Sequence, residues 1–142
     1  IRVGINSNHP ETRFGQMMAF GRDGVLSRDD VRVVADYVQS LSGAETGASA
    51  ERLAHGAQIF ADNCTSCHGE TGTGDITVGA PNLTDDFWIY GGSDEALFRT
   101  INGGRQGWMP SWEARLSSTE RKILAVYLQH LGQGAAAEGT TK

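Results

Sequence analysis

Several features that mark other classes of protein are missing from this sequence. No stretch of the 142 residues approaches the roughly 20 apolar residues of a membrane-spanning helix. No charged segment followed by an apolar one forms a leader peptide, so we expect a processed chain or a fragment. The net charge of −5 and the pI near 5.3 argue against nucleic acid as a partner.

The chain has only two cysteines, and both lie in one run of five residues, Cys64–His68. This C-x-x-C-H pattern is typical of covalent attachment of a c-type haem. Each thiol can form a thioether with one haem vinyl group, and the adjacent His68 can then bind the iron from one face. A thioredoxin-like redox pair would need a βαβ setting, and a structural zinc site would need two further ligands at suitable spacing. Neither is visible, so the motif predicts one haem c and an electron carrier.

No strand pattern occurs, whereas four segments have apolar residues at helical spacing. We expect helices over residues 50–61, from a Ser93 cap to Gly103, over about 119–131, and from a Ser27 cap to Leu41. An apolar content of 39% and 19 glycines favour long loops between them. The predicted fold is therefore all-α, with glycine-rich loops around a covalent haem.

Two of these predicted helices are copies of each other. Three positions in the first copy, Leu26, Tyr37 and Leu41, recur 90 residues later as Leu116, Tyr127 and Leu131. A repeat of this length indicates a duplicated domain, and the same displacement of Cys64 falls before Ile1. The predicted organisation is the C-terminal part of a first cytochrome module (1–42), a linker (43–49), a complete module (50–131) and a flexible tail (132–142).

The iron position opposite His68 decides the chemistry of the haem, and Met109 is the leading candidate for it. Met109 follows His68 by 41 residues, in a Gly-Trp-Met-Pro loop that Pro110 stiffens. A thioether ligand stabilises ferrous iron and leaves no position for oxygen or peroxide. The alternative is that Met109 only fills a gap in the core.

Met17 aligns with Met109 when the displacement between the two copies is increased from 90 to 92 residues. It could therefore serve the haem of the first module, or be an idle apolar side chain. A third possibility is that the two modules exchange loops, which would bring Met17 to the haem on Cys64 and Cys67. We expect local ligation by Met109, because it needs fewer long loop closures. Arg105 is a candidate partner for a haem propionate, with ordinary surface exposure as the alternative.

Residues 50–131 resemble a class I cytochrome c, because C-x-x-C-H comes early, Met-Pro comes late and an amphipathic helix closes the segment. The resemblance implies that Gly56 and Phe60 contact Tyr127 where the first and last helices cross. It also implies that the carbonyl of Pro81 orients His68.

Nearly the whole chain, residues 1–131, is similar to the dihaem subunit (CcoP/FixP) of cbb3-type cytochrome c oxidase. The similarity rests on runs at 1–6, 16–21, 79–86 and 104–110. It implies a relay from a donor cytochrome to the oxidase catalytic subunit, beside a monohaem cytochrome subunit and without a catalytic site in this chain. It also implies a second haem, an upstream membrane anchor and a place on the periplasmic side of the bacterial inner membrane. Other possible functions are the haem subunit of a periplasmic dehydrogenase, or a peroxidase or gas sensor if the sixth ligand is labile.

Overall fold

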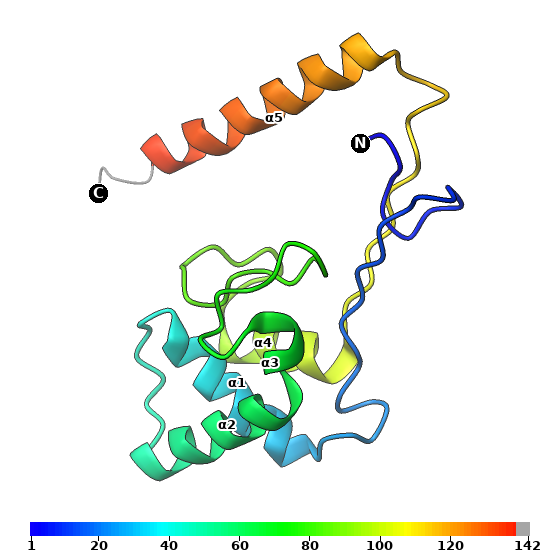
Figure 1. The fold of residues 1–142 in the computed structure, drawn as a ribbon. Helices are drawn as coiled ribbons and strands as arrows, with labels where there is room; N and C mark the ends of the chain where they lie inside the picture. Colours follow the sequence, from blue (N-terminus) through cyan, green and yellow to red (C-terminus); the bar gives the residue numbers. More distant parts are fainter. Residues whose placement is uncertain (139–142) are drawn as a thin grey trace. The chain divides into compact units, whose positions relative to one another are not determined.

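The computed structural model describes residues 1–138, with side chains as far as Leu131. These residues form the helices α1 (Arg28–Leu41), α2 (Ala50–Asn63), α3 (Thr65–His68), α4 (Asp94–Gly103) and α5 (Ser118–Glu138) (Figure 1). Only isolated β-bridges, and no strands, occur in the described part of the chain. The all-α prediction is confirmed. None of the described helices is both long and apolar enough to cross a membrane.

Three helices begin at serine caps. The hydroxyl of Ser27 accepts from the amide of Asp30, that of Ser49 from Arg52, and that of Ser93 from Ala96. These bonds satisfy amides that have no partner within the helix, so the caps set where α1, α2 and α4 start.

The last helix departs from its predicted end. It continues seven residues past Leu131 to Glu138, so most of the segment expected to be a flexible tail is helical. The rest of that expected tail, residues 139–142, lies outside the described part. The one-turn helix α3 is a further element that the sequence pattern does not mark.

The chain divides into two compact units. The larger unit consists of residues 15–106, and the smaller unit joins residues 1–14 to the chain from Gly107 onward. Helix α1 and the segment 43–49 belong to the larger unit, together with α2, α3 and α4. A helix expected in a separate first module therefore packs beside the haem motif.

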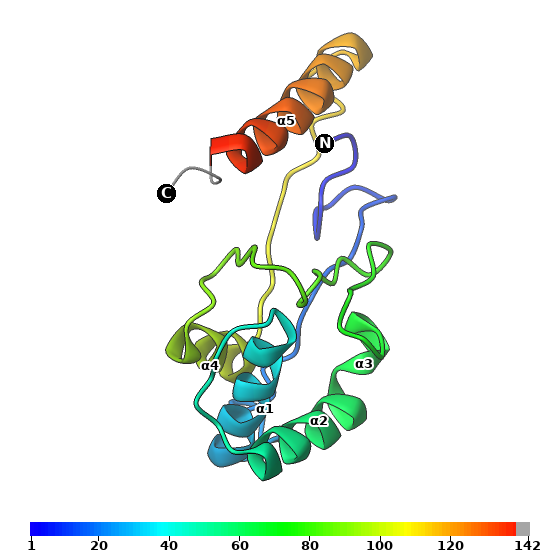
Figure 2. The same cartoon turned by 90° about the vertical axis from the view of Figure 1, so that its left-hand side faces the viewer.

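Helix α1 is the centre of the larger unit, and it packs against both α2 and α4 (Figure 2). Its buried side chains recur every three or four residues, at Val31, Val34, Ala35 and Val38. The other helices add Ile59, Phe60, Leu97, Phe98 and Ile101 to one apolar core. The same core receives the partly buried side chains of Cys64 and Met17.

The backbones of α1 and α2 approach closely at Gly56, which is buried. A Cβ atom there would lie 2.6 Å from Cβ of Tyr37 and 2.7 Å from the carbonyl oxygen of Val33. One turn further, the rings of Tyr37 and Phe60 meet at 5.5 Å between centroids. A glycine–aromatic contact of this kind was expected with Tyr127. It is formed by Tyr37, the counterpart of Tyr127 in the repeat.

The segment that leads into α1 is attached to the C-terminal end of α4. The amide of Met17 donates to the carbonyl of Arg105 at 2.7 Å, and the amide of Arg105 donates back at 3.1 Å. Gly104 has φ +67°, and a Cβ there would lie 2.5 Å from the carbonyl oxygen of Met17. Only glycine permits both this conformation and this approach, so Met17 is held as part of the larger unit.

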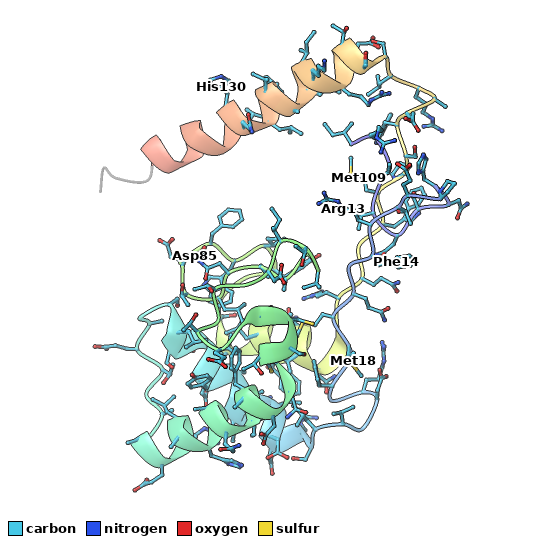
Figure 3. The ribbon with its side chains drawn as sticks, in the orientation of Figure 1. Arg13, Phe14, Met18, Asp85, Met109 and His130 are labelled. Atoms are coloured by element: carbon cyan, nitrogen blue, oxygen red, sulfur yellow. The ribbon has the colours of Figure 1, made fainter. Side chains whose placement is uncertain are left out.

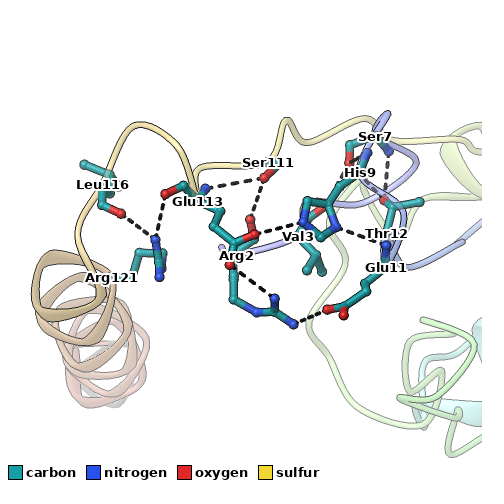
Figure 4. A network of polar contacts seen from close by, with 10 residues as sticks. All are labelled: Arg2, Val3, Ser7, His9, Glu11, Thr12, Ser111, Glu113, Leu116 and Arg121. Carbon is teal, nitrogen blue, oxygen red and sulfur yellow. Dashed lines mark hydrogen bonds and ion pairs between the residues drawn. The ribbon is translucent and has the colours of Figure 1, made fainter.

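The smaller unit joins the N-terminal segment to the loop before α5. Ile5 and Met109 exchange two backbone hydrogen bonds of 2.9 Å. The carboxylate of Glu113 lies 3.3 Å from the Arg2 guanidinium and 2.9 Å from His9 Nε2 (Figure 4). Exposed apolar side chains line α5, namely Ile123, Leu124, Val126, Tyr127, Leu128 and Leu131.

The Gly56 contact predicts a large effect from a small substitution. Gly56→Ala should destabilise the haem-loaded chain by about 1–3 kcal/mol in urea unfolding, because Val33 and Tyr37 leave no space for a methyl group. This exceeds the gain of about 0.5–1 kcal/mol expected from the better helix propensity of alanine. Gly103→Ala is the matched control, since a methyl group added there would meet nothing within 4 Å. Equal stability of the two variants would contradict the packing.

The Glu113 cluster predicts acid sensitivity of the smaller unit. Hydrogen bonds from His9 and then Arg2 lower the pKa of Glu113 below its ordinary 4.5. The stabilisation should be complete above pH 4.5 and be lost as the pH falls through the lower folded pKa. An NMR titration of the Glu113 carboxyl checks this, with Glu113→Gln removing that part of the acid dependence. A carboxyl pKa at or above 4.5 would disprove the contact.

Candidate functional site

The cysteine–histidine motif lies at the junction of α2 and α3. The amide of Cys64 donates to Phe60 at the end of α2, and the amide of His68 donates to Cys64 at 2.9 Å. Cys67 and His68 follow Cys64 by three and four residues. This spacing is about one helical turn and places all three residues on one face. The packing of α2 on α1 therefore also positions these three side chains.

Both cysteines are free thiols in the structure. Cys64 is half-buried and Cys67 is exposed. Burial, with a smaller contribution from Cys67, raises the pKa of the Cys64 thiol to about 11. Cys64 is therefore a neutral thiol at pH 7 rather than the thiolate that would bind a metal ion directly.

His68 is oriented by a carbonyl group from the following loop. Its Nδ1 lies 3.1 Å from the carbonyl oxygen of Pro81. Nδ1–H can only donate to this oxygen, so Nε2 keeps the lone pair that an iron ligand needs. Burial lowers the pKa of His68, and the bond to Pro81 offsets only part of that effect. Burial therefore keeps the imidazole neutral, and the bond to Pro81 orients it.

The loop that carries Pro81 is folded back on the motif. The amide of Gly74 donates to the carbonyl of His68 at 2.8 Å, and Asp75 and Ala80 exchange two backbone hydrogen bonds. Gly74 has φ +81°, and a Cβ there would lie 2.6 Å from the carbonyl oxygen of Pro81. Glycine at this position therefore lets the Pro81 carbonyl reach the histidine.

The residues present fit a haem c. Two free thiols can attach covalently to the haem vinyl groups, and one neutral imidazole can bind the iron. Three large apolar side chains that follow the motif in the sequence are strongly exposed. Ile76 is 85%, Phe87 75% and Ile89 68% exposed. Such side chains suit contact with an apolar plate more than with water. Among the described residues, no group of three or more His, Cys, Asp or Glu side chains forms a metal site instead.

Arg105 has two partners within the larger unit. Its Nε and Nη2 donate to the hydroxyl of Thr100 at 3.1 and 2.7 Å. Its guanidinium carbon lies 3.9 Å from the centre of the Tyr90 ring. These contacts orient the guanidinium while leaving Nη1 without a hydrogen bond to Thr100. The sequence contained no sign of Thr100 or Tyr90 as partners, because the pairing depends on the path of a loop.

The three methionines are divided between the units. Met17 belongs to the larger unit and packs against its core, while the neighbouring Met18 is 53% exposed (Figure 3). Met109 belongs to the smaller unit, where it lines a pocket with Ile1 and Ile5. The larger unit thus brings Cys64, Cys67, His68, Pro81, Arg105 and Met17 into one compact body.

An all-α unit with C-x-x-C-H at a helix junction and the histidine bonded to a proline carbonyl defines a c-type cytochrome. Residues 51–128 match the family model of the cytochrome c oxidase, cbb3-type, subunit III, and the chain belongs to this family.

Relatives of known name agree with this assignment. The chain is 51% identical over 134 residues to the cbb3-type cytochrome c oxidase subunit FixP of Bradyrhizobium sp. (strain ORS 278), covering 94% of this chain and 46% of that protein. It is 45% identical over 129 residues to the subunit CcoP of Cereibacter sphaeroides, covering 91% and 44%. The chain therefore spans about half the length of the curated relatives that it matches.

The contacts of Arg105 predict a loss of stability when they are removed. Arg105→Leu should destabilise the haem-loaded chain by about 1–2 kcal/mol, because it deletes a charged hydrogen bond to Thr100 and the stacking on Tyr90. Arg99→Leu is a suitable control, since Arg99 is exposed and its Nε donates to the carbonyl of Glu95 on its own helix. Urea unfolding compares the two, and equal midpoints would show that the Arg105 contacts contribute nothing.

Proposed function

We propose that this chain is an electron-transfer part of a cbb3-type oxidase, without a catalytic site of its own. It holds one covalent haem c through Cys64 and Cys67, with His68 and a methionine as axial ligands. It takes electrons from a donor cytochrome and passes them toward the catalytic subunit, beside the monohaem cytochrome subunit. The observation that carries the proposal is the placement of C-x-x-C-H at the end of α2, with His68 bonded to Pro81.

When bound, the haem supplies a one-electron couple. The protein residues fix its position and set its properties. Cys64 and Cys67 would tether the haem through thioethers, and His68 from the same turn would bind its iron. The hydrogen bond from His68 Nδ1 to Pro81 prevents rotation of the ring and makes Nε2 a better donor to iron. Ligands that stay in place in both oxidation states keep the reorganisation on electron transfer small.

A methionine as the second axial ligand fits the function of an electron carrier better than that of an enzyme. A thioether raises the potential and closes the iron to peroxide and oxygen, which a peroxidase or gas sensor must admit. Met109 and Met17 are the candidates, and the sequence favours Met109 for its Met-Pro loop. The family match favours an oxidase subunit over the subunit of a dehydrogenase.

Arg105 would serve as a partner for a haem propionate, because Thr100 and Tyr90 orient its guanidinium and Nη1 is not used in the bonds to Thr100. The proposed location is the periplasmic side of the bacterial inner membrane, with a membrane anchor and a second haem in the longer protein. The acidic net charge suits a donor with a basic face, and the rate of electron transfer should then fall as salt rises.

The ligand set can be tested by spectroscopy on the chain matured with haem. The ferric wild type should show the near-infrared band of sulfur-to-iron ligation, and Met17→Leu/Met109→Leu should lose it and have a lower potential. Met18→Leu is the matched control and should keep the band. Replacing Cys64 and Cys67 with Ala should leave no haem attached after denaturation. A wild type without the band that binds carbon monoxide readily would instead favour a sensor or peroxidase.

A further inference from the structure

The smaller unit contains an open pocket of about 360 Å³ at the start of α5. Its lining comes from the N-terminal segment and from the first two turns of α5, namely Ile1, Arg2, Ser118, Arg121, Lys122 and Ala125. Three of these residues carry a positive charge and none carries a negative one. All of them belong to one compact unit, and the electron transfer proposed above uses none of them. The composition of this pocket is that of a site for an anion.

Anions are not attracted to this chain by its overall charge. The net charge is −5, and the larger unit has thirteen aspartates and glutamates against six lysines and arginines. The smaller unit has the opposite balance, with six lysines and arginines against four aspartates and glutamates. Binding of an anion would therefore be a local property of the smaller unit, because the chain as a whole repels it.

Arg121 is held in place by groups that leave its charge unbalanced. Its Nη1 donates to the carbonyl oxygen of Glu113 at 3.1 Å and to that of Leu116 (Figure 4). These carbonyl groups come from the loop before α5, and they orient the guanidinium without neutralising it. Nε and Nη2 take no part in these bonds. Arg121 is therefore an oriented cation with donors left for an anion, and hydrogen bonds between charged partners are the strong ones.

The other two cations of the pocket differ in how far carboxylates balance their charge. Arg2 pairs with Glu11 and lies 3.3 Å from an oxygen of Glu113, so most of its charge is already compensated. Lys122 is exposed, and no described residue forms an ion pair with its ammonium group. Lys122 and Arg121, which are adjacent near the start of α5, therefore supply the uncompensated positive charge.

The acid closest in sequence to these two cations is already engaged elsewhere. The carboxylate of Glu120 accepts from the amide and from the hydroxyl of Ser117, each at 2.8 Å. The amide of Glu120 donates back to that hydroxyl at 3.3 Å. This reciprocal pair caps the start of α5, and Glu120 does not line the pocket. No carboxylate of the lining therefore opposes an anion.

We propose that this pocket binds a phosphate group, held by Arg121 and Lys122. A phosphate presents several acceptor oxygens, so a fixed guanidinium and a mobile ammonium can bind it together. Ile1 and Ala125 add an apolar wall, which suits a phosphate that carries an acyl chain. The group can belong to a phospholipid headgroup or to phosphate in solution. The lipid is the expected source, and this choice alone rests on the proposed function, which places the chain beside the inner membrane.

Inorganic phosphate tests the pocket directly. In the reduced, haem-loaded chain, a phosphate titration at constant ionic strength should shift the amide NMR signals of Ser118 and Lys122 to saturation. Lys122→Gln should weaken this binding about fivefold, because it removes one cation without breaking an ion pair. Arg13→Gln is the matched control and should leave the affinity unchanged, since it removes an exposed arginine of the same unit that does not line the pocket.

Lipid vesicles identify the source of the phosphate. The haem-loaded chain should sediment with vesicles of phosphatidylcholine and phosphatidylglycerol, and inorganic phosphate should compete. Arg121→Gln/Lys122→Gln should bind these vesicles about twentyfold more weakly. Saturable binding of inorganic phosphate without binding to vesicles would support the pocket and assign it to phosphate in solution. Absence of both kinds of binding, or equal affinities of Lys122→Gln, Arg13→Gln and wild type in both measurements, would overturn the proposal.

The covalent haem and the near-infrared sulfur–iron band report separately on the proposed function. Both should be the same in Lys122→Gln and in the wild type, because Lys122 has no part in holding the haem. If both are present and neither phosphate nor vesicles bind, only the proposed phosphate site is wrong. If phosphate binds to a chain without the band, only the proposed His/Met ligation is wrong.

Discussion

The crossing of α1 and α2 at Gly56 is the contact on which the rest of the larger unit depends. It brings two backbones closer than any side chain larger than hydrogen would allow. The approach fixes the direction of α2, and α2 continues through Cys64 into α3 with its hydrogen bonds intact. A single missing side chain thus determines where both thiols and the imidazole are presented.

The loop after α3 provides the second constraint, and glycine is again what permits it. Gly74 lets the loop turn with positive φ while the carbonyl of Pro81 comes within reach of His68. One constraint acts on the helix before the motif, and the other acts on the loop after it. Packing on α1 sets the position of the helix that carries the histidine, and the loop sets the rotation of its ring. An axial ligand needs both a fixed position and a fixed ring orientation. A ring that is well placed but free to rotate would still lose conformational entropy when it binds the iron.

Much of this architecture could be predicted from the sequence because it follows from local patterns. The starts of α1 and α4 follow from Ser27 and Ser93, whose hydroxyls satisfy the first helix amides. The bond from His68 to Pro81 follows from family resemblance, because Pro81 lies 13 residues beyond His68, in the loop after α3. The end of α5 could not be predicted in this way. Glycines follow Leu131 at 132 and 134, where helices commonly stop, yet α5 continues through them to Glu138.

The identity of the helix that crosses α2 at Gly56 shows a deeper limit of sequence patterns. In the predicted repeat, α1 and α5 have tyrosine, glutamine and leucine at matching positions, so the sequence alone offers two candidates for the contact with Gly56. A pattern can specify the kind of contact but not which of two equal copies makes it. The differences lie in the buried side chains: α1 has valines at Val31, Val33, Val34 and Val38. In α5 the positions displaced by 90 residues are Arg121, Ile123, Leu124 and Leu128. The smaller valine side chains suit a close crossing, whereas the larger side chains of arginine, isoleucine and leucine hold two backbones apart. Packing shape, which periodicity does not record, is therefore the property that distinguishes the copies.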